Sequence, residues 1–74
     1  MNGFVVFERD DAADQFLRSV DAIAEHFRSH LVRSSTEPLF TFRNVTAQDV
    51  KRIRELAREV GGHVRESMKY ATLG

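Results

Sequence analysis

The sequence contains no cysteine, which excludes disulfide bonds and zinc sites built on thiolates. It also lacks long hydrophobic runs. The longest is four residues, Phe4–Phe7 (FVVF), which is far too short for a signal peptide core or a membrane span. We therefore expect a cytoplasmic protein that does not contact membranes. Glycine is scarce, and its one pair, Gly61-Gly62, follows a predicted helix, whereas phosphate-binding loops follow a strand, so no cofactor is expected.

Neither sign of charge is in excess over the whole chain, because eleven basic residues balance eleven acidic ones. The two parts nevertheless differ. Residues 1–30 hold six acidic and three basic side chains, whereas residues 31–74 hold eight basic and five acidic ones. Such asymmetry can steer an anionic partner to one end or let two copies associate with opposite ends facing. Two solvated helix faces would give the same pattern.

The chain has 74 residues, which is enough for one domain, 1–74, and close to the lower limit for a self-sufficient core. Ordering it costs about 1.5 kcal/mol per residue, which apolar burial must nearly cancel. Small domains usually add disulfides, a metal or a second subunit. Because disulfides are excluded, a well-filled core, a partner or a metal site of histidines and carboxylates remains, and among these we expect a homodimer.

The periodicity of apolar residues predicts the order strand, helix, strand, helix, strand. The first strand covers residues 3–8, and Asp10 or Asp11 is expected to cap a helix over 11–32. The apolar arc of this helix comprises Phe16, Val20, Ile23, Ala24, Phe27 and Leu31, with Leu17 at its edge. Val32 falls off the arc, and Pro38 prevents any continuation of the helix.

The second half follows the same scheme. Residues 39–43 alternate as a half-buried strand, and Thr46 opens a second helix with Asp49 three residues later, a weaker form of the capping box. Its apolar arc comprises Val50, Ile53, Leu56, Ala57 and Val60. Gly61-Gly62 ends the helix. In the final strand Val64, Met68 and Tyr70 alternate with Arg65, Ser67 and Lys69, while Glu66 falls on the apolar side, as at a sheet edge or in a polar contact.

These elements predict a small α/β fold: a βαβαβ two-layer sandwich with a three-stranded sheet and two amphipathic helices. Strands joined through helices are expected to run parallel. The run Phe4–Phe7 does not alternate, so something must cover its second face. If the helices lie on opposite faces, they cover both faces of this run within one chain. If both lie on one face, which the alternation of the other strands favours, a second chain is needed. We therefore place a dimer interface at Phe4, Val5, Val6 and Phe7.

Catalytic and metal sites find little support. His26 and His30 are four residues apart, a spacing that suits a shared metal, but no carboxylate shares their side of the predicted helix and His63 is the only other imidazole. Ser19 falls near His26 on the predicted helix, but no group orients a base or forms an oxyanion site. We therefore expect no enzyme and no metal site.

The polar side of the second predicted helix carries a basic flank. Lys51, Arg54 and Arg58 cluster there, and Arg65 continues the positive charge onto the last strand. These four residues are the candidate partner-binding residues, and they would orient a protein partner by charge. The chain is thus expected to be a small protein-binding or regulatory module. The alternative is a nucleic-acid-binding regulator that uses the same residues on phosphates, although nucleic-acid binders are usually basic overall.

Overall fold

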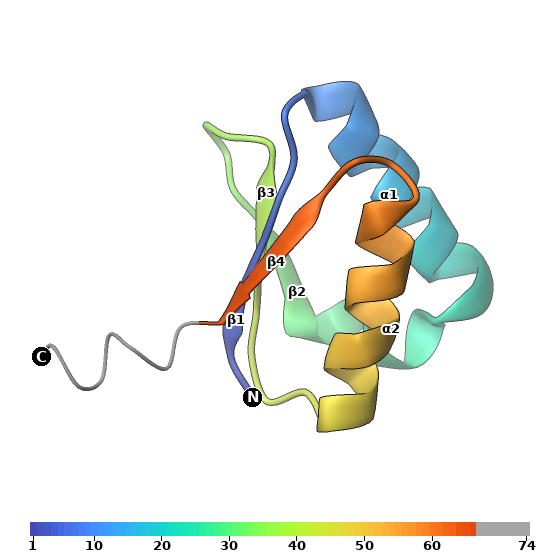
Figure 1. Ribbon diagram of the computed structural model, residues 1–74. Helices are drawn as coiled ribbons and strands as arrows, with labels where there is room; N and C mark the ends of the chain where they lie inside the picture. Colours follow the sequence, from blue (N-terminus) through green and yellow to red (C-terminus); the bar gives the residue numbers. More distant parts are fainter. Residues whose placement is uncertain (67–74) are drawn as a thin grey trace, which may run out of the picture.

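The computed structural model describes residues 1–66. Four strands and two α-helices follow one another in the order β1-α1-η1-β2-β3-α2-β4, where η1 is a short 3-10 helix (Figure 1). The elements are β1 (Gly3–Val6), α1 (Asp10–Ile23), η1 (Glu25–His30), β2 (Leu31–Arg33), β3 (Leu39–Phe42), α2 (Ala47–Arg58) and β4 (His63–Glu66). In the described part of the chain, neither helix has the length and apolar character needed to cross a bilayer.

The strands form one antiparallel sheet in the order β2-β3-β1-β4. Because β1 and β2 both run antiparallel to β3, they are parallel to each other, and so are β3 and β4 on either side of β1. Each helix therefore joins two parallel strands, but a third strand lies between them. β3 lies between β1 and β2, and β1 lies between β3 and β4. This element order, βαββαβ, is that of the split βαβ or ferredoxin-like arrangement. The prediction that the strands at 3–8 and 39–43 run parallel was wrong, because β2 intervenes between the first helix and β3.

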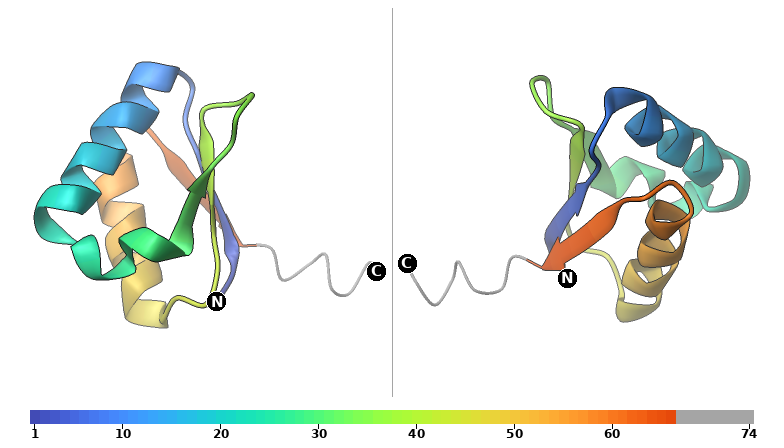
Figure 2. Two further views of the ribbon diagram at one scale, coloured as in Figure 1. Left: turned by 180° about the vertical axis from the view of Figure 1, so that it is seen from behind. Right: turned by 45° about the horizontal axis from the view of Figure 1, so that its top comes forward.

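Both helices lie on the same face of the sheet, as the polar second faces of the predicted strands favoured (Figure 2). Between the two layers lies a core in which the strands contribute Val5, Phe40 and Phe42 and the helices contribute Phe16, Val20, Phe27 and Ile53. Three rings meet at its centre, with the Phe16 centroid 5.2 Å from that of Phe7 and 5.4 Å from that of Phe40. The core therefore needs only one face of the sheet.

The prediction of a three-stranded sheet was wrong, because the first helix ends earlier than its apolar arc indicated. The α-helix stops at Ile23, which is 62% exposed rather than buried. The chain tightens into η1, which buries Phe27, and then enters β2 with Leu31 inward and Val32 outward. Residues 34–38, where Pro38 was expected to stop the helix, form the hairpin loop between β2 and β3. In a strand of three residues, the alternation of inward and outward side chains is too short to be distinguished from the periodicity of a helix.

The two helices begin differently. On α2, Asp49 N–H donates to Thr46 Oγ1 at 3.0 Å and Thr46 N–H donates to Asp49 Oδ2 at 3.2 Å, so the predicted capping box is complete. On α1, Arg9 occupies the N-cap position without a side-chain cap, so the prediction of Asp10 or Asp11 there was wrong. Both aspartates lie in the first turn, where negative charge favours the helix dipole.

The end of α2 and the last strand follow the sequence closely. Gly61 has the positive φ expected after a helix, +80°. Val64 of β4 faces the helices, and Glu66 lies on the edge strand with Oε2 3.8 Å from Arg54 Nη2, which is the polar contact that its position indicated. The predicted positions of Met68, Tyr70, Ser67 and Lys69 lie outside the described residues.

Candidate functional site

The face of the sheet that the helices leave uncovered is the main candidate surface. We call it the open face, and its strand residues are Phe4, Val6, Val32, Leu39, Thr41, His63 and Arg65. The register places Val32, Thr41, Phe4 and Arg65 in one row across the four strands. Val32 is 64% exposed, while Phe4, Val6 and Leu39 are half-buried. The open face is thus largely apolar and incompletely covered by residues 1–66.

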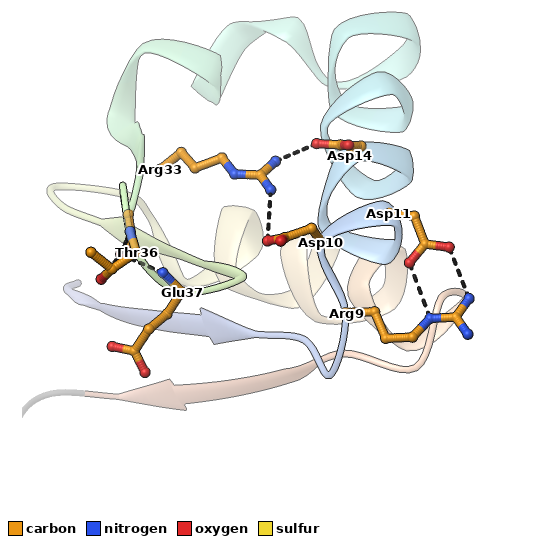
Figure 3. A network of polar contacts seen from close by, with 8 residues as sticks. Arg9, Asp10, Asp11, Asp14, Arg33, Thr36 and Glu37 are labelled. Atoms are coloured by element: carbon orange, nitrogen blue, oxygen red, sulfur yellow. Dashed lines mark hydrogen bonds and ion pairs between the residues drawn. The ribbon is translucent and has the colours of Figure 1, made fainter.

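The open face also has one sign of charge. Its charged or titratable strand residues are Arg65 and His63, which lie together on β4, and no strand residue on this face carries a carboxylate. The carboxylates of the described chain lie elsewhere. Asp10 and Asp14, for example, belong to α1 and bind Arg33 of β2, whose side chain points to the helix layer (Figure 3). The acidic first turn of α1 is therefore partly used to hold β2.

The four residues assigned to a dimer interface are divided between the two faces. Val5 is 0% and Phe7 4% exposed, because both side chains point into the core. Only Phe4 and Val6 point to the open face. Of their neighbours there, Leu39 was missed because residues 39–43 were interpreted as a half-buried strand with a polar second face, and Val32 because it was placed in a helix. Its β-branched side chain and its position off the helical arc were the available signals.

The predicted basic flank is also divided. Lys51, Arg54 and Arg58 are exposed along one side of α2, whereas Arg65 points to the open face. The charge of Arg54 is partly satisfied by Glu66, and Arg52 Nη1 lies 3.8 Å from Glu55 Oε1. Exposed pairs of this kind are weak and still compete with an incoming anion. The structure therefore brings together three of the four predicted residues.

The histidines take part in hydrogen bonds between segments. His26 Nε2 lies 3.0 Å from Asp49 Oδ1, and His30 Nδ1 lies 3.0 Å from the Arg43 carbonyl oxygen. Among residues 1–66, no three side chains of the metal-binding types come together. The Ser19 hydroxyl donates to the Gln15 carbonyl at 3.2 Å, so it is held by its own helix.

The carboxyl of Asp49 belongs to both the capping box and the His26 pair. Partial burial opposes its ionisation, but the hydrogen bonds from Thr46 and His26 favour the ionised form more strongly. The pKa of Asp49 therefore lies below its ordinary value of 3.8. This charge joins η1 to the start of α2.

Comparisons of the chain with protein-family models, curated proteins and solved structures found no match. The function is therefore inferred from the geometry and chemistry of the described surface. Two features stand out: the apolar open face, and the line of exposed bases on α2.

Proposed function

We propose that this chain is a non-enzymatic protein-binding module that forms a homodimer through the open face of its sheet. The observation that carries the proposal is the exposure of Val32 on the same face as half-buried Val6 and Leu39, a face that no helix of residues 1–66 covers. Burying such a surface against a second copy also supplies apolar burial that a 74-residue chain without disulfides needs.

The order of residues across the open face suits association of two identical copies. The row runs from apolar Val32 on one edge strand to cationic Arg65 on the other. A two-fold axis along the central strands would lay β4 of each copy over β2 of the other. Arg65 would then extend its aliphatic stem across Val32, and the cations of the two copies would stay at opposite edges.

A dimer formed in this way leaves the helix layer accessible. The bases of α2, Lys51, Arg54 and Arg58, would then meet an acidic protein partner on the outside of the dimer. In this scheme Arg65 belongs to the dimer contact rather than to the partner contact. The exposed bases would raise the association rate and set orientation more than they raise affinity.

The dimer is tested by sedimentation equilibrium on Val32→Asp, with Ile23→Asp as the matched control. The two side chains are almost equally exposed, 64% and 62%, but Ile23 lies at the end of α1, away from the open face. We expect Val32→Asp to raise the dimer dissociation constant at least about tenfold, or about 1.4 kcal/mol, and Ile23→Asp to leave it unchanged. Equal effects of the two, or a wild-type chain that is monomeric at about 1 mM, would contradict the proposal.

Nucleic acid is the second candidate, because Lys51 and Arg58 make no ion pair within residues 1–66 and lie along one side of α2. The open face does not favour RNA. Four-stranded sheets that bind RNA stack bases on two or three aromatic side chains, and Phe4 is the only phenylalanine, tyrosine or tryptophan among the described strand residues of this face. Titration of single-stranded and duplex oligonucleotides at low salt decides: binding that is lost in Arg58→Glu would establish this candidate.

A further inference from the structure

Arg43, directly after β3, stands between two neighbouring hollows of the surface. One, of about 390 Å³, is lined by Asn2, Gly3, Phe4, Thr41, Phe42, Arg43 and Asn44. The other, of about 470 Å³, is lined by Ser29, His30, Val32, Thr41, Arg43 and Asn44. Thr41, Arg43 and Asn44 are common to both, and neither hollow is lined by a carboxylate. Among arginine, lysine, aspartate and glutamate, only Arg43 lines these hollows, and hydroxyl and amide side chains lie beside it.

The charge of Arg43 is not used inside the described chain. Five of the other eight arginines have a nitrogen within 3.8 Å of a carboxylate oxygen, namely Arg9, Arg28, Arg33, Arg52 and Arg54. Arg43 has no such neighbour in residues 1–66. The hydroxyls of Ser29 and Thr41, which line the larger hollow, likewise make no side-chain hydrogen bond with the described residues. Several donors of one site are thus available to a ligand.

The backbone around Arg43 is fixed by two other segments. Arg43 N–H donates to the His30 carbonyl at 3.2 Å, and His30 Nδ1 donates in return to the Arg43 carbonyl at 3.0 Å. Nδ1 therefore carries the proton, and the second ring nitrogen, Nε2, is left for another group. Asn44 takes a positive φ of 59°, and its N–H donates to Asn2 Oδ1 at 3.0 Å. The base of the site is held in place before any ligand arrives.

We infer that the larger hollow is a binding site for a small oxyanion, a phosphate or a carboxylate, that carries an apolar group. The Arg43 guanidinium holds two of its oxygens, since the planar fork matches both anions. The hydroxyls of Ser29 and Thr41 donate to the remaining oxygens. The apolar group lies against Val32, which is 64% exposed. One chain supplies every group of the site, so the inference does not require the proposed dimer; because that dimer would cover Val32, the ligand and a second copy compete for this side chain.

The test is a titration followed by amide chemical shifts, with inorganic phosphate, phenyl phosphate and benzoate as ligands and benzyl alcohol as the uncharged control. We expect the largest shifts at the amides of His30, Thr41, Arg43 and Asn44. Phenyl phosphate should bind with a dissociation constant of about 1 mM and more tightly than phosphate, and benzyl alcohol should not bind. Arg43→Gln should weaken phenyl phosphate about tenfold or more, and Arg43→Lys less.

Arg18→Gln is the matched control, since Arg18 of α1 is also exposed and without an ion pair in the described chain but lines neither hollow. Binding unchanged in Arg43→Gln, or shifts spread equally over all exposed arginines, would overturn the inference. If a single-stranded oligonucleotide shifts the same amides and binds more tightly than phenyl phosphate, the ligand of this site is nucleic acid rather than a small molecule. Val6→Asp disturbs the open face outside both hollows, so it should weaken the dimer and leave the binding of phenyl phosphate unchanged. This variant therefore distinguishes failure of the anion site from failure of the dimer.

Discussion

The two faces of one sheet are made by alternate residues of the same strands, yet they differ sharply in burial. On the helix side, Val5 and Phe42 are fully buried and Phe40 is 1% exposed. On the open face, Val6 and Leu39 are half-buried and Val32 is mostly exposed. Apolar side chains occur on both sides. The difference teaches that the position of the helices, rather than the apolar character of a strand, decides which of its residues form the core.

The largest effect is expected from a truncation on the covered face. Phe40→Ala should lower the free energy of unfolding by about 3–5 kcal/mol, because it removes a ring that packs against Phe7 and Phe16 and leaves a cavity. The adjacent Leu39→Ala, on the open face, should cost about 1 kcal/mol. Urea denaturation of both variants measures the contrast, and equal losses would mean that the two faces are energetically alike.

A smaller effect is expected where the chain turns from α2 toward β4. A Cβ on Gly62 would lie 2.5 Å from Phe7 Cε2, so Gly62→Ala should cost about 1–3 kcal/mol through displacement of a core ring. Gly61→Ala meets nothing within 4 Å, and its cost of about 1 kcal/mol arises from the positive φ alone. Thermal unfolding gives the two values. The near-ultraviolet signal of phenylalanine should change for Gly62→Ala only, and a change in both would contradict the assignment.

A third comparison concerns the rim of the covered layer, where Asp49 joins α2 to His26. Asp49→Ala should cost about 1 kcal/mol, as loss of an N-cap contact does. Since folding lowers the pKa of Asp49, its contribution is complete above about pH 3.8 and is lost as the pH falls through the folded-state value. Denaturation of wild type and Asp49→Asn between pH 7 and pH 2 checks this, as the two curves should converge in acid. Convergence in alkali instead would mean that the sign is wrong.

The smallest effect is expected at the most exposed position of the open face. Val32→Thr keeps the side-chain shape and strand propensity, so at concentrations where the chain is monomeric its free energy of unfolding should stay within about 0.5 kcal/mol of wild type. Ile23→Thr, on α1, serves as the equally exposed control. A loss above about 1.5 kcal/mol at Val32 alone would show that this residue is buried inside a single subunit.

Much of the second half of the fold could be predicted because its signals are local. The capping box of Thr46 and Asp49, the apolar arc of α2 and the positive φ of Gly61 each depend on residues within one or two turns. The outlying Glu66 was likewise explained by an edge strand and a basic neighbour. Local chemistry was sufficient in these cases because tertiary contacts reinforce it.

The first half was harder because its decisive contacts are distant. Leu31 fits both a helical arc and an inward strand position, and its pairing with Phe42 decides between them. The interleaving of the strands, and with it the composition of the open face, depends on the same hairpin. The hollows beside Arg43 combine residues 2, 29, 30 and 44, which no local pattern connects.

The position of β1 in the middle of the sheet has a consequence for synthesis. Its hydrogen-bonded neighbours are β3 and β4, with Gly3 opposite both Phe42 and Glu66. During synthesis β1 emerges before both of its neighbours, so its pairing must wait until β3 and β4 have followed it out of the ribosome. Both pairings join segments that are far apart in the sequence, so the sheet should form more slowly than one built from hairpins alone.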